Sequence, residues 1–350
     1  MAKQPTVYDV AALAGVSIAT VSRVLTAPAS VRATTRERVE AAIEQLGYVP
    51  SASARGLAAR RTNVIGLFFP RHDDSGLGAP EITDESERVL VVRDAGEEPQ
   101  NENLYYDEVL RGAELEASRR GFALMIASGT GRELESLITD LAGRVDGLAV
   151  LAGTVPAEML ERAARHIPVV LLGGDGRQDR FDHVHSNNAP GMRALTEHLL
   201  AGGAETFAYI AGPEGSPDDI ERFGGFSQAV GDRPVQIVRG DFTRDGGRMA
   251  ATELTTLPDA VVCANDQTAL GVLDVLAARG VAVPEEVQVT GYDGIAAGRH
   301  SSPTLTTVHQ PMSELGRAAV HLVTERLEHP ERPRQAVTLP VRVVLRESSY

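Results

Sequence analysis

The segment from residue 6 to residue 25 limits what this chain can fold into more than any other part of the sequence. Thr6 and Asp9 stand three positions apart, as in a capping box, so a short helix is expected to begin there. Gly15 is expected to end that helix, because glycine enters the left-handed backbone region without a Cβ penalty. Ser17 can then cap a second helix. Two short helices joined by a glycine-containing turn predict a helix-turn-helix, whose second helix enters the DNA major groove.

The charge distribution favours DNA binding by one end of the chain. The 350 residues have a formal net charge of −14, which opposes contact with phosphates. Residues 1–62, however, hold eight basic and four acidic side chains, a net charge of +4, so residues 63–350 have a net charge of −18. A basic end on an acidic body fits a protein that touches DNA at that end only.

A third helix is expected after the helix-turn-helix. Thr34 and Glu37 have the spacing of a second capping box, and Gly47 is placed to end the helix. Three helices within residues 1–50 make a small DNA-binding headpiece. Residues 51–62 are rich in small side chains, and so short an isolated helix is marginal in water. This hinge is therefore expected to fold only when DNA or a partner chain holds it.

From residue 64 onward, short apolar runs alternate with helix-length segments, which indicates parallel sheets built of βαβ units. Strands are expected at 64–69, 123–127, 147–151, 168–172, 206–210, 259–264, 286–290 and 341–345. Helices are expected at 106–120, 133–142, 157–165, 189–202, 219–230, 245–256, 267–279 and 311–328. Residues 71–100, rich in Asp, Glu, Gly and Pro, do not fit this pattern and are interpreted as an insertion.

Several motifs resemble one known family over nearly the whole chain, apart from residues 71–100. Tyr8–Val24 and Thr35–Pro50 are similar to the N-terminal signature of the lactose-repressor (LacI/GalR) family of bacterial transcription regulators. Further motifs match in the same order: Ala264-Asn265-Asp266-Gln267, Gly291-Tyr292-Asp293 and Leu305-Thr306-Thr307-Val308.

The resemblance implies that residues 63–350 form two α/β lobes joined by crossing strands, like a periplasmic sugar-binding protein. The near lobe would comprise about 63–184 and 312–338, and the far lobe about 185–311 and 339–350. A three-helix head reads only half of a site, so a homodimer on a palindromic operator in double-stranded DNA is expected.

The second helix of the head would carry sequence recognition. Ile18 and Ala19 occupy its N-terminal turn, where family members choose their operator; here both are apolar and can touch only thymine methyl groups. Arg23 suits a bidentate contact with guanine, although an arginine on a solvated helix face is the plainer interpretation. Expected phosphate contacts, each equally a cap or a surface hydroxyl, are Thr6, Ser17, Thr20, Ser22 and Thr35.

In the hinge, the resemblance implies a special role for Leu57. A leucine in an alanine-rich segment is most often a core residue. The family, however, uses its hinge leucine as a wedge between base steps in the minor groove, where unstacking is offset by the contacts that the kink allows. Ala54 and Arg55 would lie along the same groove.

The resemblance also implies an effector site between the lobes. Its expected side chains are Tyr105, Tyr106, Arg222, Phe242, Asn265, Asp293 and Gln310. Their carboxylate, amide and guanidinium groups suit adjacent hydroxyls, and the aromatic rings suit the apolar face of a sugar. Asn265 could instead cap the next helix, and Phe242 could be a core residue.

Three departures from the family pattern limit this transfer. Sugar-binding members usually have an arginine where this chain has Ile220, and often Asp or Arg where it has Gly173-Gly174. Asn187 replaces a usual Asp. A structural role for Arg222 and a larger glycoside as effector therefore remain open.

Other classes of protein find little support. No secretory signal and no apolar stretch of 18 residues is present, so a bacterial cytoplasmic protein is expected rather than a transport protein or a membrane protein. His183, His185 and His198 match no metal spacing and are expected in loops and at the surface. No nucleophile turn occurs, so no enzyme, metal or cofactor is expected. Cys263 is expected to be a small core residue.

The favoured interpretation is a repressor of carbohydrate-utilisation genes that a mono- or oligosaccharide releases from its operator. Two alternatives use the same architecture: a corepressor-dependent repressor, and a sensor of a non-sugar effector such as a nucleobase.

Overall fold

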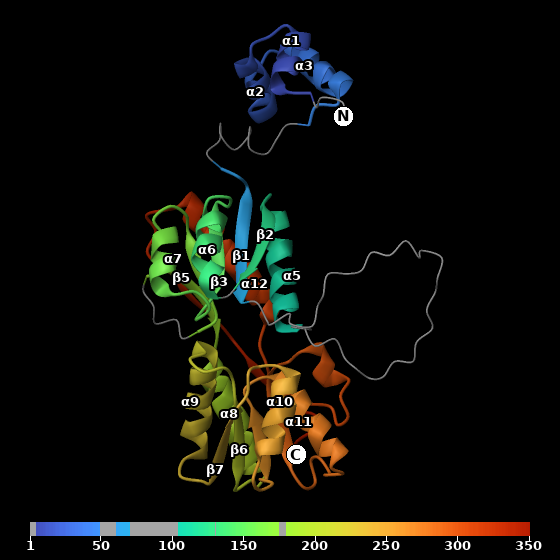
Figure 1. Ribbon diagram of the computed structural model, residues 1–350, viewed down its shortest axis with the longest axis vertical. Coiled ribbons are helices and arrows are strands. Elements are labelled where there is room, and N and C mark those ends of the chain that lie inside the picture. The colour runs from blue at the N-terminus through green and yellow to red at the C-terminus, as the bar shows by residue number, and fades with distance from the viewer. Residues whose placement is uncertain (1–4, 50–60, 71–103, 130, 175–179) are drawn as a thin grey trace, which may run out of the picture.

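The computed structural model describes residues 5–49, 61–70, 104–129, 131–174 and 180–350. Along its long axis lie a small helical head, the near lobe and the far lobe (Figure 1). Most of the expected insertion and the hinge residues Ala54, Arg55 and Leu57 lie outside the described residues. Within these ranges no single helix is long and apolar enough to cross a membrane, and only the first two helices, bent by 103° to each other, meet that standard as a pair.

The head contains α1 (Val7–Ala14), α2 (Ile18–Thr26), the short 3-10 turn η1 (Pro28–Ser30) and α3 (Ala33–Leu46). The predicted capping box of α1 is confirmed, since Thr6 N donates to Asp9 Oδ2 at 2.7 Å. Gly15 ends α1 with φ 62° and Gly47 ends α3 with φ 60°, both in the left-handed region. Val10, Val21 and Val39, one from each helix, meet in the small core of the head.

The predicted capping box of α3 is wrong. The helix begins at Ala33, with Arg32 as the N-cap and no side-chain cap, so Thr34 lies inside the first turn. Val31 packs against the core of the head and brings the chain into the helix earlier than the Thr34–Glu37 spacing suggests.

The near lobe contains a parallel six-stranded sheet in the order β11-β5-β4-β3-β1-β2. Its strands are β1 (Val64–Pro70), β2 (Ala123–Gly129), β3 (Gly147–Leu151), β4 (Val169–Leu172), β5 (Asp182–Ser186) and β11 (Ala336–Leu339). Its helices are α5 (Leu104–Arg119), η2 (Gly131–Glu133), α6 (Leu134–Ala142), α7 (Ala157–Ala163) and α12 (Met312–Glu328).

The far lobe contains a second six-stranded sheet in the order β12-β10-β9-β8-β6-β7, in which only the β12–β10 pair is antiparallel. Its strands are β6 (Phe207–Ala211), β7 (Val235–Arg239), β8 (Ala260–Cys263), β9 (Gln288–Asp293), β10 (Thr306–His309) and β12 (Arg342–Val344). Its helices are α8 (Asn188–Ala201), α9 (Pro217–Val230), α10 (Arg244–Glu253), α11 (Asp266–Ala278) and the 3-10 turn η3 (Ala296–Arg299).

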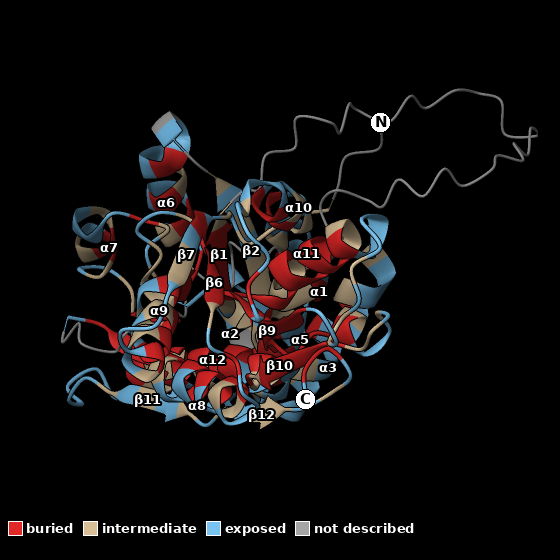
Figure 2. Cartoon of the chain, turned by 90° about the horizontal axis from the view of Figure 1, so that it is seen from below, coloured by how far each residue is buried: buried red, intermediate tan, exposed pale blue. Residues whose placement is uncertain are grey.

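Each sheet is buried between two helical layers. In β1, Ile65 and Leu67 join the core with α5 and α12, whereas Phe68 joins residues of α6 and α7 on the other face. This alternation follows from the two-residue period of a strand. Figure 2 shows the buried strands between helices whose outer faces are exposed.

The expected core strands and helices are all present, with ends shifted by up to three residues. The strands β5, β7, β10 and β11 were not expected, because each is short and mixes polar with apolar side chains. Cys263 lies fully buried in β8, as expected, and burial raises the pKa of its thiol.

The prediction that the histidines lie in loops and at the surface is wrong. His183 and His185 lie in β5 and His198 lies in α8; His183 is only 2% exposed. The His183 ring tolerates burial because its Nε2 donates to the carbonyl of Gly173. In the described part of the chain, no three His, Cys, Asp or Glu side chains could together hold a metal ion.

Candidate DNA-reading head and effector pocket

The residues expected to read DNA lie on the exposed side of α2. Ile18 is 40% exposed, and Ala19 and Arg23 are exposed as well. A helix-turn-helix turns the N-terminal part of its second helix toward base edges. These three side chains are therefore accessible to a duplex.

The hydroxyls expected to contact phosphates already stabilise the head. Thr6 Oγ1 donates to the carboxylate of the α1 capping box at 2.7 Å. Ser17 Oγ accepts from Thr20 N at 3.3 Å and lies 2.9 Å from Thr20 Oγ1. Ser22 and Thr35 are half-buried. Phosphate contact by the capping hydroxyls would be a second role added to this structural one.

Two kinds of residue in the head were missed. Tyr8 and Leu13 are large apolar side chains that α1 leaves exposed. Arg38 of α3 donates to the carbonyls of Ala14 and Gly15, the second at 3.2 Å, and so ties α3 to the turn. The sequence signal for the first kind was that Tyr8 and Leu13 lie off the Val10, Ala11 and Ala14 face that packs in the core; for Arg38 there was none.

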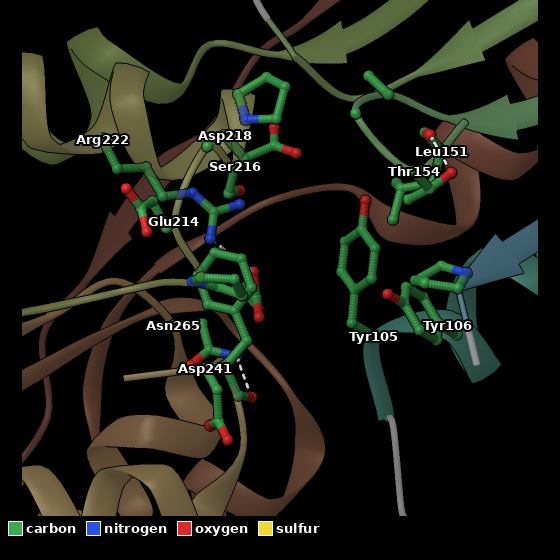
Figure 3. A pocket seen from close by; sticks show the side chains of 18 residues that line it. Tyr105, Tyr106, Leu151, Thr154, Glu214, Ser216, Asp218, Arg222, Asp241 and Asn265 are labelled. Carbon is green, nitrogen blue, oxygen red and sulfur yellow. Dashed lines mark hydrogen bonds and ion pairs between the residues drawn. The ribbon is translucent and has the colours of Figure 1, made fainter. Parts of the chain in front are cut away.

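A cavity of about 340 Å³ opens between the two lobes. In Figure 3, Tyr105 and Tyr106 of the near lobe face Arg222 and Asn265 of the far lobe. All the expected effector residues line it except Gln310. The lining residues are Pro70, Tyr105, Tyr106, Leu151, Ala152, Gly153, Thr154, Pro213, Glu214, Gly215, Ser216, Pro217, Asp218, Arg222, Asp241, Phe242, Asn265 and Asp293.

Arg222 is the only basic side chain among the described lining residues. Its Nε donates to Asn188 Oδ1 at 3.0 Å and its Nη1 to the Ala264 carbonyl at 2.8 Å. The guanidinium carbon lies 3.9 Å from the ring centroid of Tyr292, and Nη1 lies 3.6 Å from Asp293 Oδ1. Arg222 thus braces the far lobe and also presents a cation to the cavity. Burial works against that charge, but the neighbouring carboxylates more than compensate and raise the pKa of the guanidinium.

Asp293 is connected to two segments that cross between the lobes. Gln310, just after β10, donates from Nε2 to Asp293 Oδ1 at 2.6 Å. Ser186, at the end of β5, donates from Oγ to Gln310 Oε1 at 2.7 Å. Gln310 is only 2% exposed and both ends of its amide have partners. Gln310 therefore does not line the cavity in this structure. It fixes the position of the Asp293 carboxylate, which does.

A second buried carboxylate supports the backbone at Asp293, whose φ of 118° is unusual for a residue other than glycine. Asp266 Oδ2 accepts from Gly294 N at 2.7 Å and Ile295 N at 2.9 Å, and its Oδ1 accepts from Thr307 Oγ1 at 2.6 Å. Burial raises the pKa of Asp266 to about 8, with a further contribution from Asp293. Burial also raises the pKa of Asp293 to about 6, although Arg222 and Gln310 act in the opposite direction.

The aromatic residues form two groups on opposite sides of the cavity. Tyr106 lies 4.8 Å from Phe69 and 5.6 Å from Tyr105, measured between ring centroids. Phe242 packs so closely on Gly212 that a Cβ there would lie 2.3 Å from the ring. Burial and nearby carboxylates raise the pKa of Tyr105, so its hydroxyl stays protonated at neutral pH and can donate to a ligand.

Asn265 does cap a helix, as the plainer interpretation held, and also lines the cavity. Its Oδ1 accepts from Thr268 N at 3.0 Å at the start of α11. Its Nδ2 donates to the carbonyl of Phe242 at 2.9 Å. The same amide thus fixes the helix start and the backbone that carries the Phe242 ring.

Three lining carboxylates were missed: Glu214, Asp218 and Asp241. Glu214 and Asp218 flank the Ser-Pro start of α9, where Ser216 Oγ accepts from Asp219 N at 3.3 Å. Asp218 lies in the first turn of α9, where an acidic residue is favoured in any helix, so its position gave no sign of a pocket.

Comparison with known proteins decides the family. The model of bacterial regulatory proteins of the lacI family matches residues 6–51, and that of a periplasmic binding protein-like domain matches residues 196–349. The HTH-type transcriptional repressor PurR of Vibrio parahaemolyticus serotype O3:K6 is 31% identical over 98% of each chain. This chain belongs to the lacI family. It is therefore a DNA-binding transcriptional repressor rather than an enzyme.

Two solved structures extend the likeness over the whole lacI-family architecture. The CelR–cellobiose complex is 32% identical with a TM-score of 0.69, covering 99% of this chain and 100% of the other. The lac repressor dimer bound to operator and the anti-inducer ONPF is 27% identical with a TM-score of 0.80, covering 99% of each chain. The expected fold class, an α/β core of two lobes behind a helix-turn-helix head, is confirmed.

Proposed function

We propose that this lacI-family regulator is a homodimeric repressor of carbohydrate-utilisation genes, and that a sugar in the cavity releases it from a palindromic operator. The observation that carries this proposal is the lining of the cavity. Tyr105 and Phe242 bring aromatic rings to the hydrogen-bonding groups of Arg222 and Asp293. A sugar combines an apolar face with adjacent hydroxyls, which that combination of groups suits.

Size and charge favour a small neutral carbohydrate. A cavity of about 340 Å³ is near the lower end of the range for small-molecule sites. Among the described lining residues, four carboxylates (Glu214, Asp218, Asp241 and Asp293) face one cation, that of Arg222. An anionic effector such as a sugar phosphate would be repelled. CelR, a relative of known structure, holds cellobiose.

On DNA, Arg23 would read guanine while Ile18 and Ala19 contact thymine methyl groups. Capping hydroxyls such as Ser17 would face phosphates. The hinge wedge of Leu57, with Ala54 and Arg55 in the minor groove, completes the proposal but lies outside the described residues.

The near lobe offers a surface for the second protomer. Leu115 of α5 is 53% exposed and Ile126 of β2 is 54% exposed. Among the described strands, β2 lies at the edge of its sheet. Apolar side chains exposed beside a sheet edge favour burial against another chain. A symmetric pairing here would set two heads side by side for a palindrome.

Hydrogen bonds offer a direct route from the cavity to the crossing segments. An effector that forms a hydrogen bond with Asp293 would change the bond between Asp293 and Gln310. Through Gln310 it would also affect Ser186. These residues lie where the chain passes between the lobes, so a change there alters how the lobes sit. A coupling of about 1–3 kcal/mol would weaken operator binding roughly 5- to 150-fold.

A nucleobase corepressor is the second candidate. The flat rings of Tyr105 and Phe242 also suit stacking on a planar base, and Asp293 could accept from its edge. In that case ligand would strengthen DNA binding.

A thermal-shift screen of sugars and nucleobases, followed by gel shift with genomic fragments, tests the proposal. We expect a mono- or oligosaccharide to raise the melting temperature and to release a bound fragment. A nucleobase that tightens binding would favour the second candidate. Failure to bind any fragment at moderate ionic strength, with or without ligand, would overturn both.

A further inference from the structure

Three glycines of the near lobe form a seat for the start of α9 in the far lobe. Gly153 follows β3, and Gly173 and Gly174 follow β4; their φ angles are 80°, 75° and 80°. A Cβ on Gly173 would lie 2.8 Å from Asp218 Oδ2, and a Cβ on Gly153 would lie 2.8 Å from Pro217 Cδ. Side chains at these positions would therefore hold the lobes apart.

Among the described residues at this seat, one hydrogen bond crosses between the lobes. Gly174 N donates to Asp218 Oδ1 at 3.0 Å. The same oxygen accepts from Asn188 Nδ2 at 2.8 Å, and Asn188 Oδ1 in turn accepts from Arg222 Nε at 3.0 Å. Asp218 therefore joins the near lobe to the cation of the pocket.

Two stacked histidines of β5 form hydrogen bonds with the backbone of Gly173 and Gly174. The rings of His183 and His185 lie 5.0 Å apart at an interplanar angle of 18°. His183 Nε2 is bonded to the carbonyl of Gly173, and His185 Nδ1 lies 3.1 Å from the carbonyl of Gly174. Because a carbonyl only accepts, both ring nitrogens must donate. The orientation of the Gly174 peptide is thus fixed before Asp218 arrives.

We propose that Asp218 is a positioning residue that holds the two lobes closed on one another. Its carboxylate occupies the space that a side chain at Gly173 would fill, and accepts the N–H that the histidine pair presents. The sensing role of this closure rests on the proposed function, but the contact itself needs neither effector nor DNA. An effector that engages Arg222 then acts on an element already joined to the near lobe through Asn188.

The distance between the lobes can be measured directly in the full-length protein. We would place spin labels or a dye pair at Glu158→Cys and Asp232→Cys, exposed positions in the near and far lobes. Cys263 is fully buried and should not react. Without DNA or effector, we expect one short distance for this parent. Because a hydrogen bond to a charged group is lost, Asp218→Ala should raise the ratio of open to closed molecules about tenfold or more.

Two matched variants separate the hydrogen bond from charge and from misfolding. Glu214→Ala removes a carboxylate from the same rim that makes no inter-lobe bond among the described residues, and should keep the parent distance. Asp218→Asn keeps an acceptor oxygen and should stay closer to the parent than Asp218→Ala. A parental distance in folded Asp218→Ala, or equal opening by Glu214→Ala, would overturn the proposal. Both results are read from the inter-lobe distance alone. Failure of the proposed function is read separately, as failure of the parent protein to bind any genomic fragment, so the two failures are distinguishable.

Discussion

Replacing Gln310 with alanine should destabilise the core far more than the loss of one glutamine normally does. Gln310 makes two buried hydrogen bonds, from Ser186 Oγ at 2.7 Å and to Asp293 Oδ1 at 2.6 Å. In the Gln310→Ala variant both partners remain buried, but each loses this bond. The penalty is therefore set by the groups left behind rather than by the side chain removed.

The structure gives the size of the effect. An unsatisfied buried polar group costs about 1–3 kcal/mol, and more when it is charged. Ser186 and Asp293 together therefore predict a loss of roughly 2–5 kcal/mol. One kcal/mol shifts the melting temperature by about 2–4 °C in a domain of 150–250 residues, so a shift of roughly 4–20 °C is expected. The Asp293 pKa should rise further, since its hydrogen bond from Gln310 lowers it.

Gln236→Ala is the matched control. Gln236 also uses both ends of its amide, donating to the Thr256 carbonyl at 2.8 Å and accepting from Thr255 Oγ1 at 2.8 Å. These bonds are exposed, so water can replace them and the loss should stay within about 1 kcal/mol. The chain has no tryptophan, so unfolding is best followed by circular dichroism. Equal melting temperatures for the two variants would refute the reasoning.

Three further outcomes are expected. Arg23→Ala should weaken operator binding by about 1–3 kcal/mol, mainly through one base pair, without changing the melting temperature; anisotropy titrations that show uniform weakening on all sequences would contradict base reading. Ile126→Asp should shift the dimer toward monomer in light scattering, and an unchanged mass would exclude β2 from the interface. The core should melt at a lower temperature at pH 9 than at pH 5. Burial raises the pKa of Asp293 to about 6 and that of Asp266 to about 8, so the folded state holds these protons more tightly than the unfolded state does. The stability that this provides is complete below the ordinary pKa of an aspartate and is lost as the pH rises through about 6 and 8. Higher stability at pH 9 in calorimetry would contradict this.

The sequence predicts the head and the order of core elements well because the signals are local. Caps at Thr6 and Ser17 and the end of α1 at Gly15 depend on neighbours within a few positions. The apolar runs of central strands such as β1 and β8 reflect burial on both faces and need no knowledge of the partner. The start of α3 is the exception within the head, because packing of Val31 decided it over the local spacing.

The missed strand β5 shows where local reasoning ends. Its residues Asp182, His183 and His185 look like a polar loop. In the fold, Asp182 is paired with Arg326 at 2.8 Å, across 144 positions, and His183 is bonded to Gly173. Polar groups can be buried once such partners exist, but only the tertiary structure supplies them.

Gly173-Gly174 shows how a long-range pair changes the meaning of a substitution. By comparison with the family pattern, the two glycines look like the loss of a ligand-binding side chain. The structure shows that they make room for Asp218, which lies 44 positions after Gly174. The Asp218 carboxylate accepts a hydrogen bond from Gly174 N. A carboxylate is thus present at the same side of the cavity, supplied by the opposite lobe. Because it now bridges the lobes, the exchange adds a contact between them that a carboxylate on the near lobe alone would not provide.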